Sequence, residues 1–148
     1  MSFGRTTSYE FGSDLPFESV DGGKSLLVTG PESAGLDRLV HELLSPDDDE
    51  GLLAVTTDED GRSFRRTQRR IAGDVDDDRL RVVDCEGRSS RDDCIDTVAG
   101  PDDLDGINLQ LSSASDELRF GDVEAVRVGI TSVAPLIATA SDIRDIYR

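Results

Sequence analysis

The sequence predicts an α/β fold in which a mainly parallel β-sheet lies between helices, giving a three-layer αβα domain. Short apolar runs of strand length alternate along the chain with longer segments whose apolar residues recur at three- and four-residue steps. Strands that alternate with helices build a parallel sheet that helices cover on both faces. The connections between these segments are short, and the chain has no internal repeat.

The first half of the chain contains two strand and helix pairs. Residues 25–29 are apolar and predict a first strand, which a glycine loop links to a helix with leucines and a valine at helical spacing over 36–44. Residues 51–57 predict a second, buried strand that ends in an acidic turn. A second helix is predicted over 63–72, and Gly73 stops it.

The second half continues the alternation. Residues 80–84 predict a short third strand, and the polar, glycine-bounded residues 87–100 predict a loop. A third helix is predicted from Pro101 to Leu118, since proline and acidic residues favour a first helical turn. Residues 126–133 predict a fourth strand, and Ser141 and Asp142 cap a last helix that reaches the end of the chain. Residues 1–14 are expected to be a flexible N-terminal segment, and residues 15–148 a single domain.

The charge of the chain indicates the surroundings in which it works. The formal net charge is -16 over 148 residues, with 32 acidic and 16 basic side chains, and Lys24 is the only lysine. So many acidic side chains repel one another in dilute buffer. Multimolar salt screens this repulsion, because the Debye length at 1 M is about 3 Å. We therefore expect a cytoplasmic protein of an extreme halophile, and an acidic protein that binds cations or basic partners is the alternative. No apolar signal core is found at the start, and the longest apolar run is too short to span a bilayer, so no membrane association is expected.

Two cysteines and one histidine are the other candidates for chemistry. Cys85 and Cys94 lie nine residues apart, which fits neither a zinc knuckle nor a redox C-x-x-C motif, and we expect free thiols. His41 has no second ligand at a zinc-like spacing, so a packed or solvated side chain is expected and no metal site.

The glycine loop of residues 30–37 occupies the place of a phosphate-binding P-loop between a strand and a helix. The pattern G-x-x-x-x-G-K-[ST] needs a lysine for the β and γ phosphates and then a hydroxyl for magnesium. Those two positions hold Leu36 and Asp37. Gly30 and Gly35 are also explained by a tight turn that needs no ligand. The backbone N–H groups of the helix start and Arg38 are the remaining features that favour an anion.

The order of these segments resembles the RecA/KaiC-type ATPase core, and most closely the divergent KaiC-like proteins of haloarchaea. The resemblance covers about residues 15–148 and depends on the glycine loop, on the acidic turn after the second strand, on residues 101–107 and on Thr131–Ser132. It implies a P-loop NTPase core that is incomplete at the C-terminus, because members of that superfamily continue with further strands. It also implies the positions of a degenerate nucleotide site: Gly30, Gly35, Leu36, Asp37, Arg38 and Thr131, with Asp58 and Glu59 in the region of the catalytic glutamate.

Three of the four catalytic parts of that family are absent. Leu36 replaces the P-loop lysine, Asp37 replaces the hydroxyl that binds magnesium, and Thr131 replaces the Walker B acid. The first hypothesis is therefore a catalytically inactive domain without a cofactor, serving as a regulatory or protein-interaction module in signalling or transcriptional control. The alternative is an atypical ATPase or nucleotide sensor that binds ATP with magnesium through Arg38, Asp58 and Glu59.

A sheet that lacks further strands leaves an open edge, so a protein partner or self-association is expected. Nucleic-acid binding is not expected, because no basic stripe with interleaved aromatic residues is present. The second-helix arginines are instead expected to form salt links with nearby acids; they are Arg65, Arg66, Arg69 and Arg70.

Overall fold

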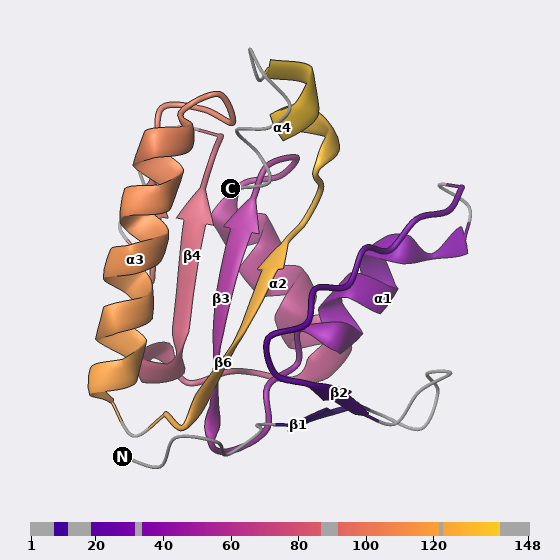
Figure 1. Cartoon of the computed structure of the whole chain (residues 1–148), viewed down its shortest axis with the longest axis vertical. Coiled ribbons are helices and arrows are strands. Elements are labelled where there is room, and N and C mark those ends of the chain that lie inside the picture. The colour runs from indigo at the N-terminus through magenta and orange to yellow at the C-terminus, as the bar shows by residue number, and fades with distance from the viewer. Residues whose placement is uncertain (1–7, 12–18, 32–33, 87–91, 122, 140–148) are drawn as a thin grey trace.

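A four-stranded parallel sheet forms the centre of the computed structural model, which describes residues 8–11, 19–31, 34–86, 92–121 and 123–139. The strand order is β5-β4-β3-β6, and every neighbouring pair is parallel (Figure 1). The bounds of the strands are β3 Glu50–Thr56, β4 Leu80–Asp84, β5 Ile95–Thr97 and β6 Ala125–Ile130.

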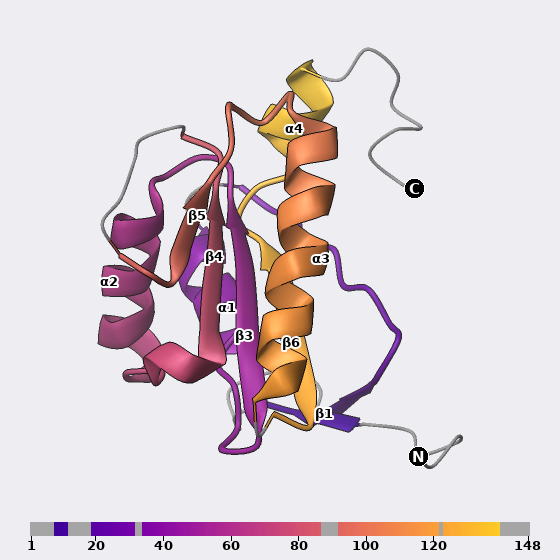
Figure 2. The same cartoon turned by 90° about the vertical axis from the view of Figure 1, so that its left-hand side faces the viewer.

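Helices cover both faces of this sheet (Figure 2). One face carries α1 (Leu36–Leu43) and α2 (Gly61–Ala72), and the other carries α3 (Leu104–Phe120) and the short α4 (Ala134–Thr139). The predicted α/β fold with three layers and a mainly parallel sheet is therefore confirmed.

The core consists of two apolar layers, one on each side of the sheet. All seven residues of β3 are buried, since this strand lies between two others and under helices on both faces. Phe64 of α2 packs against Leu52 and Val82 on one side, while Leu118 of α3 packs against Leu53 and Val55 on the other. Successive residues of a strand point to opposite faces, which is why one apolar run supplies both layers.

The ends of α2 follow from local chemistry. Asp60 caps its first turn, because the carboxylate accepts a hydrogen bond from the backbone N–H of Ser63 at 2.7 Å. Gly73 ends the helix with φ of 87°, a left-handed value that glycine adopts without strain. The predicted stop at this glycine is confirmed.

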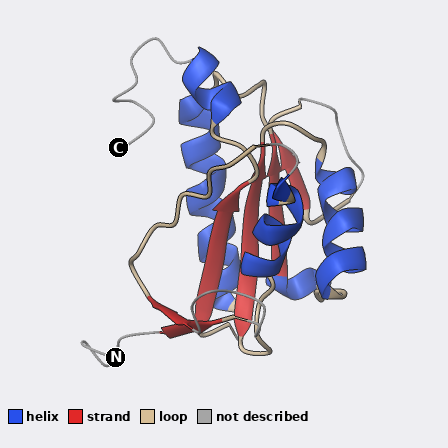
Figure 3. Cartoon of the chain, turned by 90° about the vertical axis from the view of Figure 1, so that its right-hand side faces the viewer, coloured by secondary structure: helices blue, strands red, loops and turns tan. Residues whose placement is uncertain are grey.

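A two-stranded antiparallel hairpin lies at the end of the sheet where β6 begins (Figure 3). It pairs β1 (Ser8–Glu10) with β2 (Ser19–Asp21), and β1 lies within the segment that the sequence separates from the domain. The side chain of Arg127 on β6 holds this hairpin, because its guanidinium donates to the carbonyl of Glu10 at 2.6 Å and lies over the rings of Tyr9 and Phe11.

Arg127 forms a buried ion pair with Glu50, the first residue of β3. The Nε to Oε1 distance is 2.9 Å, and the two side chains are 4% and 5% exposed. The same guanidinium donates to the carbonyl of Leu43 at the end of α1, and Glu50 accepts from the backbone N–H of Asp47. One ion pair therefore connects the hairpin, α1, β3 and β6.

Three parts of the sequence prediction differ from the structure. Residues 25–29 form no strand; they belong to an irregular connection from β2 to α1, because no strand beside them shares their backbone hydrogen bonds. The predicted loop 87–100 contains β5, which pairs with β4 through three residues. The fourth strand ends at Ile130, and α4 follows it. The predicted helix from Ser141 onward lies outside the described residues.

Breaking the buried pair should destabilise the whole domain. Replacing Arg127 by methionine leaves the Glu50 carboxylate buried and unpaired, which costs about 3–5 kcal/mol of unfolding free energy. Denaturant unfolding in high salt measures this loss. The matched control is Arg81→Met, whose partner Glu117 is 53% exposed, and it should cost less than about 1 kcal/mol. Equal losses in the two variants would contradict the role given to the pair.

Candidate functional site

Three segments that the sequence singles out meet at the carboxyl end of the parallel strands. They are the turn after β3 with Asp58 and Glu59, the turn after β6 with Thr131, and the start of α1 with Asp37. Ligands of open α/β sheets bind at this end of the strands. This group is therefore the candidate site.

Hydrogen bonds join the turns after β3 and β6. The Thr131 hydroxyl donates to an Asp58 carboxylate oxygen at 2.7 Å and accepts from the backbone N–H of Thr57 at 3.2 Å. The Thr57 hydroxyl donates to the carbonyl of Ser132 at 2.5 Å. Both hydrogen-bonding roles of Thr131 are thus used within the protein, and the threonine fixes the two strand ends relative to one another.

Glu59 is the most perturbed carboxyl group of the site. Partial burial is the largest cause and the neighbouring charges of Asp58, Asp37 and Asp60 add to it; together they raise the pKa of Glu59 to about 7. Asp37 comes from α1, more than twenty positions earlier in the sequence, so the fold brings it within electrostatic reach of the turn after β3. The sequence predicts these positions as one site, and the structure places them together.

The glycine loop has the shape of a tight entry into α1. Gly35 is the N-cap of the helix and has φ of 74°, which a residue with a side chain rarely adopts. A methyl group added at Gly30 would lie 3.4 Å from a Cδ atom of Leu36. The side chain of Leu36, at the position of the P-loop lysine, therefore packs against Gly30 of the loop.

Arg38, the cation closest to the loop in sequence, points along α1. Its Nε lies 3.0 Å from Oε1 of Glu42, one helical turn later, and its side chain is 74% exposed. Asp37 stands in the first turn of the same helix, where its charge already complements the helix dipole. The residues present do not fit a nucleoside triphosphate with magnesium, since Leu36 and Asp37 stand where the lysine and the hydroxyl are needed and Asp37 and Glu59 bring negative charge to the loop.

Asp84 is a site residue that the sequence analysis missed. It ends β4, is 2% exposed, and accepts hydrogen bonds from the backbone N–H groups of Gly61 at 3.0 Å and Glu86 at 2.8 Å. It thereby holds the start of α2 beside the strand ends. An aspartate that directly follows a buried apolar run was the available signal. Next to it the buried Thr56 hydroxyl, on the paired residue of β3, makes no hydrogen bond within the described part of the chain.

The remaining candidates are structural. His41 is buried, stacks on Phe64 with ring centroids 4.8 Å apart, and its Nδ1 lies 2.6 Å from Oε1 of Gln68. Cys85 and Cys94 are free and buried, and burial raises the pKa of both thiols, that of Cys85 to about 11. A thiol with a raised pKa is a poor nucleophile. Among the described residues, no group of three or more potential ligands could hold a metal ion.

Two of the four α2 arginines for which salt links were predicted, Arg65 and Arg69, form them. Arg65 pairs with Asp77 and with Asp92, and Arg69 pairs with Asp74 at 3.1 Å. They line an open depression of about 510 Å³ in which three arginines face three aspartates. Because the charges balance, this surface offers no net positive potential to a phosphate backbone.

The family of the chain follows from a comparison with protein-family models. DUF7504, described as a family of unknown function, matches residues 23–148. The chain belongs to the DUF7504 family. The matched region includes the glycine loop, the acidic turn and Thr131, but not β1. No match was found among the curated proteins or among the solved structures. In the described part of the chain, no helix has the length and apolar character needed to cross a membrane.

Glu59 should make the protein less stable as the pH rises. Its folded pKa of about 7 lies above the usual glutamate value of 4.5, so the folded state binds the proton more tightly. Stability should therefore fall between about pH 4.5 and pH 7 and then level off. Glu59→Gln should remove this slope and raise stability at pH 8 by on the order of 1 kcal/mol, after discounting for solvent screening.

Thermal unfolding at pH 4.5 and pH 8 measures the effect of Glu59→Gln. The control is Glu86→Gln, an exposed carboxyl group on the loop after β4, which should leave the pH profile unchanged. If the stability of Glu59→Gln falls with pH as steeply as that of the unaltered chain, the ionised Glu59 carboxylate does not destabilise the fold and the prediction is wrong.

Proposed function

We propose that this DUF7504 domain is a catalytically inactive RecA/KaiC-like module that acts through protein interaction, in signalling or transcriptional control in a halophile. The parallel α/β sheet is consistent with a core of that type, while residues 25–29, which such a core would use as the strand before its P-loop, form no strand. The observation that carries the proposal is the acidic character of the place where the phosphates would lie, with Asp37 acting on Glu59 across the loop.

The electrostatic cost of a nucleotide supports this proposal. A carboxylate about 4 Å from a phosphate oxygen costs about 4 kcal/mol at an effective dielectric constant of 20. Asp37 and Asp58 lie within electrostatic reach of Glu59 beside this loop, and Arg38 is directed at Glu42. Salt screens the outer part of such repulsion but not a desolvated contact.

The alternative, an atypical ATPase or nucleotide sensor, depends on Arg38 leaving Glu42 to replace the missing lysine. It also depends on Asp58 exchanging the Thr131 hydroxyl for magnesium or water. No contact of the described residues favours either change, so we retain the interaction module as the function that the site supports best.

Thermal unfolding in about 3 M KCl with millimolar ATP and magnesium tests the proposal. We expect no change in Tm. A nucleotide at 100 times its Kd would add about 2.7 kcal/mol of stability, which is a rise on the order of 5–10 °C for a domain of this size. A rise in Tm that Arg38→Ala abolishes would contradict the proposal and support the sensor.

The double variant Leu36→Lys, Asp37→Ser provides a matched comparison. It restores the lysine and the hydroxyl that the P-loop pattern requires. A nucleotide-dependent rise in Tm in this variant alone would assign the loss of binding to these two residues.

A further inference from the structure

β6 is the edge strand of the sheet that the structure describes, and no described strand pairs with its outer edge. The backbone N–H of Thr131 donates to the carbonyl of Val55 on β3 at 3.0 Å. Backbone groups of a strand point alternately to the two sides. Arg127 and Gly129 therefore bond to β3 like Thr131, and Val126, Val128 and Ile130 direct their N–H and C=O groups away from the sheet.

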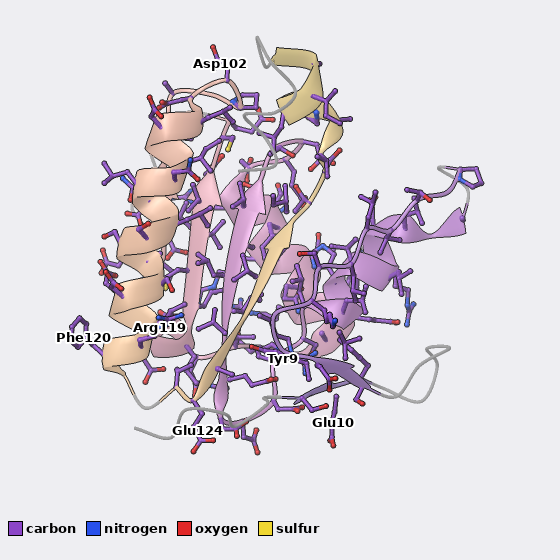
Figure 4. The ribbon with its side chains drawn as sticks, viewed as in Figure 1. Tyr9, Glu10, Asp102, Arg119, Phe120 and Glu124 are labelled. Carbon is purple, nitrogen blue, oxygen red and sulfur yellow. The ribbon has the colours of Figure 1, made fainter. Side chains whose placement is uncertain are left out.

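Only the start of this edge is covered. The hydroxyl of Tyr9, on the hairpin, donates to the carbonyl of Val126 at 3.3 Å (Figure 4). Beyond it, the side chains of Val128 and Ile130 are 58% and 40% exposed. Within the described ranges no strand pairs with β6 on this side. A half-apolar strand with an unpaired edge is a template for another strand.

Acidic residues stand at both ends of the open edge. Asp58 is bonded to Thr131 directly after β6, and Glu59 follows it. At the other end lie Glu124, whose backbone N–H bonds to the carbonyl of Asp49, and Glu10 on the hairpin (Figure 4). These carboxyl groups lie on either side of a short apolar stretch, which consists of the exposed side chains of Val128 and Ile130.

We propose that an extended segment of a partner protein pairs with β6 as a further strand, placing apolar side chains beside Val128 and Ile130 and a lysine or arginine against Asp58 and Glu59. This inference rests on the proposed function and specifies its partner. Backbone hydrogen bonds supply the affinity of such strand addition, and the side chains on alternate positions supply the specificity.

The charges argue against a second copy of this chain as the occupant. An antiparallel pairing of two β6 strands brings Asp58 of each copy beside Glu124 of the other, and a parallel pairing brings the two acidic turns side by side. Like charges across an interface oppose association. A basic residue reverses the sign of this contact, because it offsets the charges of Asp58, Asp37 and Asp60, which add to burial in raising the pKa of Glu59.

Selection from random 12-residue peptides displayed on phage, against the full chain in 1 M KCl without nucleotide, tests the proposal. Enriched peptides should alternate apolar and polar residues and carry lysine or arginine at one end. The synthetic form of the leading peptide, followed by fluorescence anisotropy, should bind Val128→Lys at least 10-fold more weakly than the unaltered chain. Ile130→Lys should act in the same way.

The matched control is Leu109→Lys, an exposed leucine of α3 whose side chain is 69% exposed, and it should leave the affinity unchanged. Val128→Lys should fold, because this side chain is exposed and its N–H faces away from β3, and a thermal melt verifies that.

Three results would overturn the proposal: no enrichment, equal binding by Val128→Lys, or a dimer in sedimentation that Val128→Lys abolishes. None of these results involves ATP, so they are distinct from a failure of the proposed function.

Discussion

The buried ion pair between Arg127 and Glu50 is the constraint on which the arrangement of this domain depends. The Arg127 guanidinium donates hydrogen bonds to the carbonyls of Leu43 and Glu10. It also lies over the rings of Tyr9 and Phe11 in the N-terminal segment. Removing a charge from water is costly unless every partner is in place. The pair therefore fixes at one point where β3 starts, where α1 ends and how the hairpin covers the first part of β6.

The sequence was sufficient for the elements whose signals are local. Apolar runs predicted β3, β4 and β6, and helical spacing with a stopping Gly73 predicted α2. Residues 25–29 have the same apolar character as β3 but form no strand, because a strand exists only where a neighbour accepts its hydrogen bonds. β5 was missed for the opposite reason, since its three residues form a strand only because β4 lies beside them.

The candidate site was predictable in position but not in detail. Asp58, Glu59 and Thr131 were expected near the glycine loop, and Thr131 does bond to Asp58. The direction of Arg38 toward Glu42 and the buried role of Asp84 depend on side-chain placement that no spacing encodes. The site and the open edge of β6 meet at Thr131, so an acidic site and a strand-pairing surface adjoin one another. This adjacency links the proposed loss of nucleotide binding to the proposed gain of a basic protein partner.

Hydrogen exchange of the backbone amides, followed residue by residue by NMR in high salt, tests most directly the claim that the sheet ends at β6. The amides of Arg127 and Gly129 should exchange slowly, because they bond to β3, whereas those of Val128, Ile130 and residues 25–29 should exchange much faster. Slow exchange at both Val128 and Leu26–Val28 would contradict the account, since it would place residues 25–29 in the sheet as a fifth strand.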